Sequence, residues 1–283
     1  MIRLDDKVAI VTGGGRGLGR AYALALAGAG ACVVVNDLGV RLDGSAPGDQ
    51  SAGAVVNEIR RAGGHAIANT DSVADPAAVQ RLVDSTLALF QRIDIVVNNA
   101  GIVRSRPIEA MGDADFDDVL AVHLRGTFLC TRAAMRAMRA AGRGGRIINT
   151  TSGRAYYAPS AGTANYASAK GGIISLTGVA AVEGKDAGII CNALSPLART
   201  RMSAQYLAND QDDALDPATV APLVVFLASD AAAGVTGQVF RVARGEIATV
   251  TTAMGPPIRS TRGRWTAEEI AERIPSIIAS TPT

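Results

Sequence analysis

Two side chains four residues apart, Tyr166 and Lys170, could together perform acid–base chemistry. On a helix this spacing places them on one face, one turn apart. A free tyrosine has a pKa of about 10, so a tyrosine base working near neutral pH needs that pKa lowered by roughly two to three units. A lysine ammonium within a few ångströms favours the tyrosinate. The pair could therefore take the hydroxyl proton of an alcohol that is being oxidised, or return it in the reverse reaction.

A serine that could assist this pair, Ser152, lies 14 residues before Tyr166, just after the apolar segment Arg146–Asn149. At a strand end its hydroxyl could hydrogen-bond the substrate oxygen and stabilise the charge that develops there. Taken alone, Tyr-x3-Lys also fits a surface helical pair, and Ser152 fits a strand-end cap. The catalytic interpretation requires that other parts of the chain bind a hydride acceptor.

A glycine-dense turn between a strand and a helix could bind that acceptor. Val8–Val11 is apolar and predicts a buried strand, and the alanine-rich segment Arg20–Ala27 predicts a helix. The order strand, glycine loop, helix directs backbone N–H groups towards a pyrophosphate. The spacing Gly13-x3-Gly17-x-Gly19 differs from the common G-x-G-x-x-G pattern. The residues expected to contact the cofactor here are Gly13, Gly15, Arg16, Gly17, Leu18 and Gly19.

An acidic residue after the second strand indicates which cofactor is used. The segment Ala31–Val35 predicts that strand, and Asp37 follows it, 18 residues beyond Gly19. A carboxylate at this point can accept hydrogen bonds from both adenine-ribose hydroxyls and repels the 2′-phosphate of NADP. Asp37 therefore favours NAD, although Arg16 could pair with a 2′-phosphate and argues weakly for NADP.

Polar residues also follow the third and fourth predicted strands, His65–Asn69 and Ile93–Val97. In open α/β sheets ligands bind at the carboxyl ends of the strands. We therefore expect further cofactor contacts from Asp71, Ser72, Val73, Asn99, Ala100 and Gly101, with Asp71 accepting a hydrogen bond from the adenine amino group.

Strand and helix patterns alternate along the chain, which predicts a single-domain Rossmann-type fold. We expect a doubly wound parallel sheet of about seven strands with helices on both faces. Residues 1–251 form the predicted catalytic domain, with a polar substrate lid at about 197–216, and residues 252–283 form a C-terminal extension. Within the extension, Thr266 and Glu269 form a predicted capping box for a short helix.

Composition restricts the class of protein. Hydrophobic residues make up 48% of the 283 residues and the net charge is +2, too small to suggest nucleic-acid binding. The three cysteines, Cys32, Cys130 and Cys191, are far apart in apolar runs, so they predict core residues rather than disulfides or a metal site. No apolar run reaches about 18 residues and no leader is evident. We expect a cytoplasmic protein that binds neither membranes nor nucleic acid.

As a set, these motifs resemble the classical short-chain dehydrogenases/reductases over roughly residues 5–245. The resemblance implies that Ser152, Tyr166 and Lys170 are catalytic and that Lys170 also binds the nicotinamide ribose. It further implies that Pro196 and Thr200 line the nicotinamide site. It also implies a homotetramer or dimer that acts on a small-molecule substrate.

Three positions depart from the family pattern. His123 occupies the place of a fourth catalytic residue, an asparagine, which in the family holds a helix kink and a water leading to the lysine. A histidine there could do the same, could titrate near neutral pH, or could be a packed core residue. Leu197 replaces a glycine next to Pro196, and Val242-Ala-Arg-Gly245 replaces an Asp-Gly-Gly turn.

Other segments resemble the (3R)-hydroxyacyl-CoA dehydrogenase branch of this family, which suggests a 3-hydroxyacyl thioester substrate. They are Asn36-Asp-Leu-Gly39 with the insertion that follows, Asp71-Ser-Val73, Val122-His-Leu-Arg-Gly126 and Pro196-Leu-Ala-Arg-Thr-Arg-Met202. The side chains that could meet CoA phosphates, or simply form a solvated rim, are Arg104, Arg106, Arg154, Arg199 and Arg201. Those that could line an apolar pocket, or pack within the lid, are Tyr156, Tyr157, Met202, Tyr206 and Leu207.

Two alternatives remain open. The protein could be a short-chain dehydrogenase of a steroid, terpenol or other free alcohol, or a non-catalytic NAD(P)-sensing regulator with the same fold.

Overall fold

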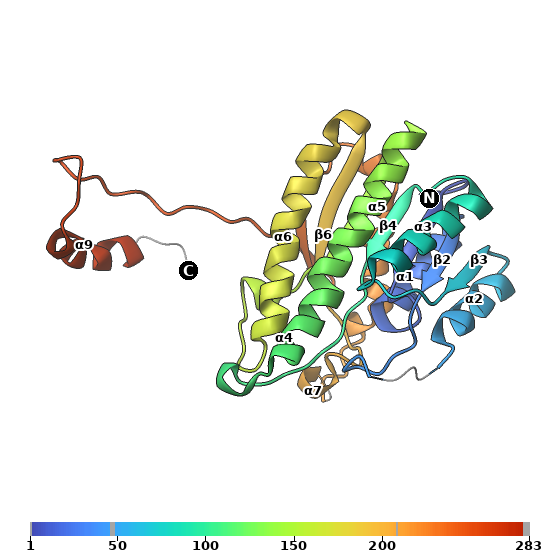
Figure 1. Cartoon of the computed structure of the whole chain (residues 1–283), viewed down its shortest axis with the longest axis horizontal. Helices are drawn as coiled ribbons and strands as arrows, with labels where there is room; N and C mark the ends of the chain where they lie inside the picture. Colours follow the sequence, from blue (N-terminus) through green and yellow to red (C-terminus); the bar gives the residue numbers. More distant parts are fainter. Residues whose placement is uncertain (1, 46–48, 208, 280–283) are drawn as a thin grey trace. The chain divides into compact units, whose positions relative to one another are not determined.

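Eight strands form one sheet in the order β3-β2-β1-β4-β5-β6-β7-β8 (Figure 1). The structure is a computed structural model that describes residues 2–45, 49–207 and 209–279. All neighbouring strands are parallel except β7 and β8. The strands are β1 (Val8–Thr12), β2 (Cys32–Asn36), β3 (Ala66–Asn69), β4 (Ile95–Asn98), β5 (Gly145–Thr150), β6 (Ile189–Leu197), β7 (Val239–Ala243) and β8 (Glu246–Thr249).

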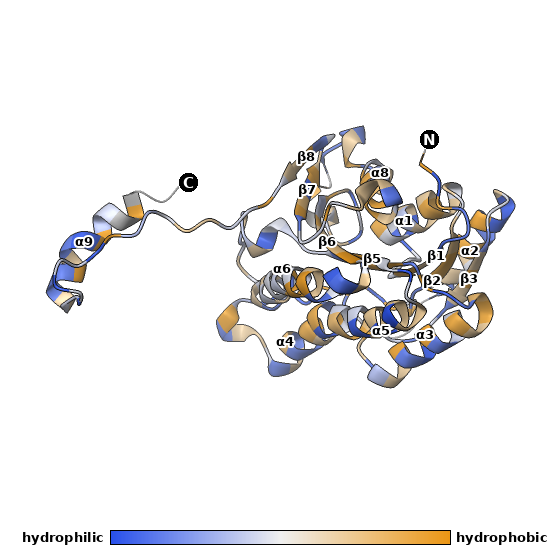
Figure 2. Ribbon diagram, turned by 90° about the horizontal axis from the view of Figure 1, so that it is seen from above, coloured by the Kyte–Doolittle hydropathy of each residue, from blue (hydrophilic) through white to orange (hydrophobic). Residues whose placement is uncertain are grey.

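Helices cover both faces of this sheet, which confirms the predicted doubly wound fold (Figure 2). One face carries α1 (Gly17–Gly28), α2 (Ser51–Arg61) and α8 (Ala221–Ala228). The other carries α3 (Pro76–Phe90), α4 (Asp113–Leu120), α5 (Gly126–Ala141) and α6 (Ala164–Gly184). Successive strand residues point to opposite faces, so Val11 joins the first layer and Ile10 the second. Burial on both faces explains why the inner strands are continuous apolar runs.

The last strand, β8, was not predicted. It pairs antiparallel with β7 through a two-residue turn at Arg244 and Gly245, whose φ angles are 51° and 78°. Arg244 tolerates this left-handed conformation while its guanidinium pairs with Asp210 and Asp212. The side chains of β8 are all exposed, so no apolar pattern marks it in the sequence.

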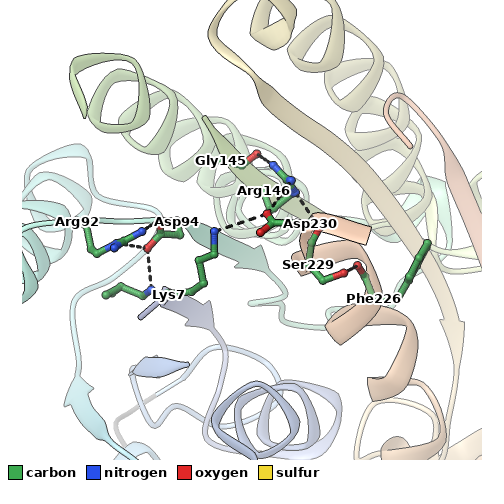
Figure 3. A network of polar contacts seen from close by, with 9 residues as sticks. Lys7, Arg92, Asp94, Gly145, Arg146, Phe226, Ser229 and Asp230 are labelled. Atoms are coloured by element: carbon green, nitrogen blue, oxygen red, sulfur yellow. Dashed lines mark hydrogen bonds and ion pairs between the residues drawn. The ribbon is translucent and has the colours of Figure 1, made fainter. Parts of the chain in front are cut away.

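The amino ends of the strands are joined by a polar network at the edge of the sheet away from the glycine loop (Figure 3). Asp94 accepts a hydrogen bond from Val8 N, 2.8 Å away, and pairs with Arg92. Asp230 pairs with Lys7 and with Arg146. These contacts fix the positions of β1, β4 and β5 relative to one another, and thereby the positions of their opposite ends.

The sequence pattern over Phe116–Met138 predicts a long helix with a break at Gly126. In the structure a π-helical turn, Ala121–Arg125, lies just before Gly126 and separates α4 from α5. The segment predicted as an irregular lid contains the short helix α7 (Ala204–Leu207) and a 3-10 turn, Asp213–Leu215.

Residues 250–283 form a second compact unit. It contains α9 (Ala267–Ala279), which begins with the predicted capping box. Thr266 N donates to Glu269 Oε2 over 2.9 Å, and Glu269 N donates to Thr266 Oγ1 over 3.3 Å. Among the described residues, no helix is both long and apolar enough to cross a bilayer.

Candidate active site

A cavity of about 540 Å³ lies at the carboxyl ends of the strands. It includes the point between β1 and β4 where the strand order reverses, the usual ligand position in such sheets. Gly15 and Gly19 belong to the same glycine loop without lining the cavity. The other predicted site residues all line it: Gly13, Arg16, Gly17, Leu18, Asp37, Asp71, Ser72, Val73, Asn99, Ala100, Gly101, His123, Ser152, Tyr166, Lys170, Pro196 and Thr200.

The glycine loop has the shape required to hold a pyrophosphate. Gly13 has φ of 61°, and a Cβ there would lie 2.8 Å from the Cα of Ala100. A Cβ on Gly19 would collide with the carbonyl oxygen of Gly13. Helix α1 starts after Arg16 without a side-chain cap, so its first N–H groups are left for a ligand. These features fit the phosphates of a dinucleotide.

The loop is attached to the end of β4 by Thr12, a residue of the loop motif to which the sequence assigned no role of its own. Its hydroxyl accepts hydrogen bonds from Asn99 N and Ala100 N at 3.0 and 3.2 Å. Asn99 Nδ2 in return donates to the carbonyl oxygens of Thr12 and Gly13, both at 3.1 Å. A threonine ending an apolar strand gave no signal of this role, because the contact joins segments 87 residues apart.

Asp37 and Arg16, the two residues that bear on the choice between NAD and NADP, both make polar contacts within the protein. Asp37 accepts hydrogen bonds from Gly15 N at 2.9 Å and Gly39 N at 2.8 Å. Arg16 pairs with Asp49, on the segment inserted after β2, and donates to the carbonyl of Val40. The Arg16 charge is thus neutralised within the protein.

Asp71 makes contacts that the sequence did not suggest. Its carboxylate pairs with Arg81 at 2.8 Å and accepts a hydrogen bond from Asn69 Nδ2 at 2.8 Å. The predicted adenine contact would therefore be an additional bond to a group that already has two partners.

Ser152, Tyr166 and Lys170 come together between β5 and α6. The Tyr166 ring is half-buried because one side faces the cavity. Burial raises the pKa of its phenol, while a hydrogen bond with Ser152 and the positive charge of Arg154 act to lower it. Lys170 is buried, its Nζ donates to Thr150 O over 2.6 Å, and it lies 5.6 Å from the centre of the Tyr166 ring. Burial lowers the pKa of Lys170 to about 7.

His123 lies within the π-helical turn and is almost completely buried. Its Nε2 contacts the backbone N and O of Ile102 at 3.0 and 2.8 Å, and its ring meets that of Tyr166 edge to face at 5.1 Å. Burial, reinforced by the nearby Lys170, lowers the pKa of His123 to about 3. A pKa this low favours a neutral imidazole across the physiological range, which argues against titration near neutral pH, one of the three roles considered for His123 from the sequence.

The residues expected around the substrate divide into two groups. Met202, Tyr206 and Leu207 line the cavity, whereas Tyr156 and Tyr157 do not. The Tyr156 hydroxyl donates to Ser195, and the Tyr157 ring lies under the Arg241 guanidinium.

The arginines expected at the mouth also divide. Arg104 pairs with Asp118, and Arg199 donates to the carbonyls of Asp210 and Asp212, so both are engaged within the protein. Arg104, Arg154 and Arg201 line the cavity, whereas Arg106 and Arg199 do not. No cluster of three or more potential metal ligands occurs within the described ranges.

Comparison with known proteins identifies the family. The short chain dehydrogenase model matches residues 7–211. The chain belongs to this family. A short chain dehydrogenase from Mycobacterium avium superposes with a TM-score of 0.88 and 43% identity, covering 99% of this chain and 97% of the other.

Within the family, the relatives support the hydroxyacyl-CoA dehydrogenase branch. The chain is 43% identical to hydroxyacyl-CoA dehydrogenase ChsB1 of Mycobacterium tuberculosis, over 90% of this chain and 81% of the relative. It is 45% identical to peroxisomal multifunctional enzyme type 2 of Mus musculus, over 87% of this chain. The chain spans only 33% of the length of that enzyme.

Proposed function

We propose that this short-chain dehydrogenase oxidises the hydroxyl group of a 3-hydroxyacyl thioester with NAD, or catalyses the reverse reduction. The observation that carries the proposal is the grouping of Ser152, Tyr166 and Lys170 in the cavity that also contains the glycine loop. The dinucleotide, when bound, supplies the hydride acceptor.

The side chains divide the acid–base work. Tyr166 takes the hydroxyl proton of the substrate during oxidation, or returns it during reduction. Ser152 hydrogen-bonds the substrate oxygen and the Tyr166 phenol. Lys170 adds a positive charge that favours tyrosinate, and it is held in place by the Thr150 carbonyl. His123, neutral and bonded to Ile102, supports the Tyr166 ring from its edge.

NAD is preferred to NADP in this proposal because of charge. The Asp37 carboxylate lines the cavity after β2, where it would repel a 2′-phosphate. Arg16, a residue of the glycine loop, is already paired with Asp49. A lower KM for NADP than for NAD would contradict this part of the proposal.

The thioester substrate is supported by the two relatives and by the shape of the site. The cavity lined by Tyr166 is also lined by Met202, Tyr206 and Leu207, which offer apolar surface to an acyl chain. The alternative substrate is a free steroid, terpenol or other secondary alcohol. Equal turnover of such an alcohol and of a 3-hydroxyacyl-CoA would argue for the alternative.

The test is formation of reduced cofactor from NAD and 3-hydroxyacyl-CoAs of different chain lengths. Tyr166→Phe removes the phenol and is expected to lower kcat about 1000-fold, in keeping with the size of general acid–base effects. Tyr157→Phe is the matched control, because Tyr157 is 67% exposed and does not line the cavity. Equal activity of Tyr166→Phe and wild type would remove Tyr166 from catalysis. NAD binding without turnover of any substrate would favour the regulator.

The proposal includes assembly as a homotetramer or dimer. Helices α5 and α6 carry exposed apolar side chains, Phe128, Val179 and Val182, and a second copy would cover them. Light scattering of wild type and Val182→Glu tests this, with a smaller mass expected for the variant. Catalysis is assigned to residues 1–251 and not to the extension 252–283. A cytoplasmic location stays a prediction.

A further inference from the structure

Arg154 lies beside the catalytic groups in a position that the proposed mechanism does not use. It belongs to the 3-10 turn Gly153–Ala155, which begins immediately after Ser152. Its backbone N donates a hydrogen bond to the Ser152 hydroxyl over 3.3 Å, so the backbone of Arg154 is positioned next to that serine. Its positive charge acts on the Tyr166 phenol. Arg154 also lines the same cavity as Ser152 and Tyr166, so it is a cation in the space where the substrate oxygen would react.

The Arg154 side chain is held in a defined orientation. One nitrogen, Nη1, donates to the carbonyl of Ala158 at 2.9 Å. The guanidinium carbon lies 4.8 Å from the centre of the Tyr206 ring, on helix α7 of the lid. A guanidinium has five N–H donors. Within the described part of the chain, the only hydrogen bond of the side chain is the one to Ala158, and the residue lines the cavity.

We propose that Arg154 donates a hydrogen bond to the acyl carbonyl oxygen of the substrate and so selects 3-hydroxyacyl thioesters over alcohols without that carbonyl. The inference rests on the proposed function and adds a specificity-determining residue to it. In a 3-hydroxyacyl thioester, one methylene separates the reacting carbon from the carbonyl carbon. When Ser152 and Tyr166 hold the hydroxyl, the carbonyl oxygen must lie close by, as Arg154 does.

The position of Arg154 argues against the alternative that it binds CoA phosphates. The pantetheine arm separates those phosphates from the thioester, so a residue that contacts them lies at the mouth of a cavity. Arg154 is instead half-buried, and its guanidinium lies over the Tyr206 ring within the cavity. Arg201, which is exposed and lines the same cavity, is better placed for a phosphate.

Two substrates that differ only in the carbonyl test the proposal: 3-hydroxybutyryl-CoA and its thioether analogue, S-(3-hydroxybutyl)-CoA. For Arg154→Gln, the ratio of kcat/KM for the thioester to that for the thioether is expected to fall about 10- to 100-fold, the range for loss of a charged hydrogen bond. Arg154→Lys is expected to keep part of the ratio. Tyr206→Leu removes the ring beneath the guanidinium and is expected to lower the ratio of kcat/KM for the thioester to that for the thioether several-fold.

Arg201→Gln is the matched control, because it removes the same charge from the rim and is expected to leave the ratio unchanged. An equal loss with both substrates in Arg154→Gln, or no loss with either, overturns the role of Arg154. A ratio that falls equally in Arg201→Gln also overturns the role of Arg154, because the loss of any positive charge at the cavity would then explain the effect. Wild-type protein that oxidises neither compound overturns the proposed function, and with it this inference. Unchanged NAD affinity and melting temperature show that each variant is folded.

Discussion

Replacing Lys170 by methionine tests whether an ammonium group activates the tyrosine. Lys170 Nζ is 5.6 Å from the centre of the Tyr166 ring. At an effective dielectric constant of about 20, unit charges at this separation attract by about 3 kcal/mol, which equals roughly two pKa units. Because tyrosinate and ammonium stabilise each other, the two groups titrate as a coupled pair.

The expected result is a slower enzyme with a displaced pH profile. We expect Lys170→Met to lower kcat/KM for alcohol oxidation about 100-fold at pH 7. We also expect the rising limb of the pH profile to move to higher pH by about two units. The assay is initial NAD reduction over the pH range in which the protein stays folded. Lys185→Met is the control, because Lys185 is exposed just beyond the end of α6.

The same variant has an expected effect on stability with a defined sign. Burial lowers the pKa of Lys170 from 10.5 to about 7, which corresponds to a cost of about 5 kcal/mol for the ammonium in the folded state. Below pH 7 that cost is fully present. With Tyr166 protonated, and so with no tyrosinate to stabilise the ammonium, the folded chain loses between pH 7 and 10.5 a proton that the unfolded chain keeps, so the stability of the wild type rises with pH. We therefore expect the melting temperature of Lys170→Met to exceed that of the wild type at pH 7. Loss of the hydrogen bond to Thr150 reduces this gain. The difference between the two melting temperatures is expected to shrink towards pH 10.

Two results would refute this reasoning. One is an unchanged rate and pH limb in Lys170→Met. The other is a difference in melting temperature between variant and wild type that does not vary with pH.

Three further predictions concern cofactor choice, the imidazole and the opposite edge of the sheet. Asp49→Ala frees Arg16 and should raise kcat/KM for NADP relative to NAD about tenfold; an unchanged ratio would show that the ion pair does not set specificity. His123→Asn should show the same pH limbs as wild type between pH 5 and 9, because the pKa of about 3 keeps the imidazole neutral; a lost limb would contradict this. Asp94→Ala leaves Val8 N without its partner, so calorimetry should show about 2 kcal/mol less stability with unchanged kcat, whereas a large loss of kcat would connect this edge to the site.

The fold was largely predictable because its signals are local. Continuous apolar strands, the Asp75-Pro76 start of α3 and the Thr266 capping box each depend on neighbouring residues. The exposed strand β8 was missed because it buries no side chain. The π-helical turn was missed for a different reason: Gly126 suggested only a break, whereas the extra residue in the turn accommodates the contact between His123 and Ile102.

The candidate site also has features that the sequence predicted and features that only the structure showed. Residue types and spacing were enough to single out Ser152, Tyr166, Lys170 and the glycine loop, because a helical turn and a strand–loop–helix unit have regular geometry. Electrostatic state was not accessible from these patterns. The neutral His123 and the lowered pKa of Lys170 arise from burial by segments far away in the chain.

The amino-acid order alone was thus sufficient for most of the elements, their succession and the side chains able to do chemistry, since these follow from backbone preferences over a few residues. Tertiary packing decided which of the charged residues remain available to a ligand. It paired Arg16 with Asp49 and Arg104 with Asp118, and it placed the Arg154 guanidinium over the Tyr206 ring. The physical reason is that a charge is cancelled or exposed by its neighbours in space, and those neighbours come from distant parts of the chain.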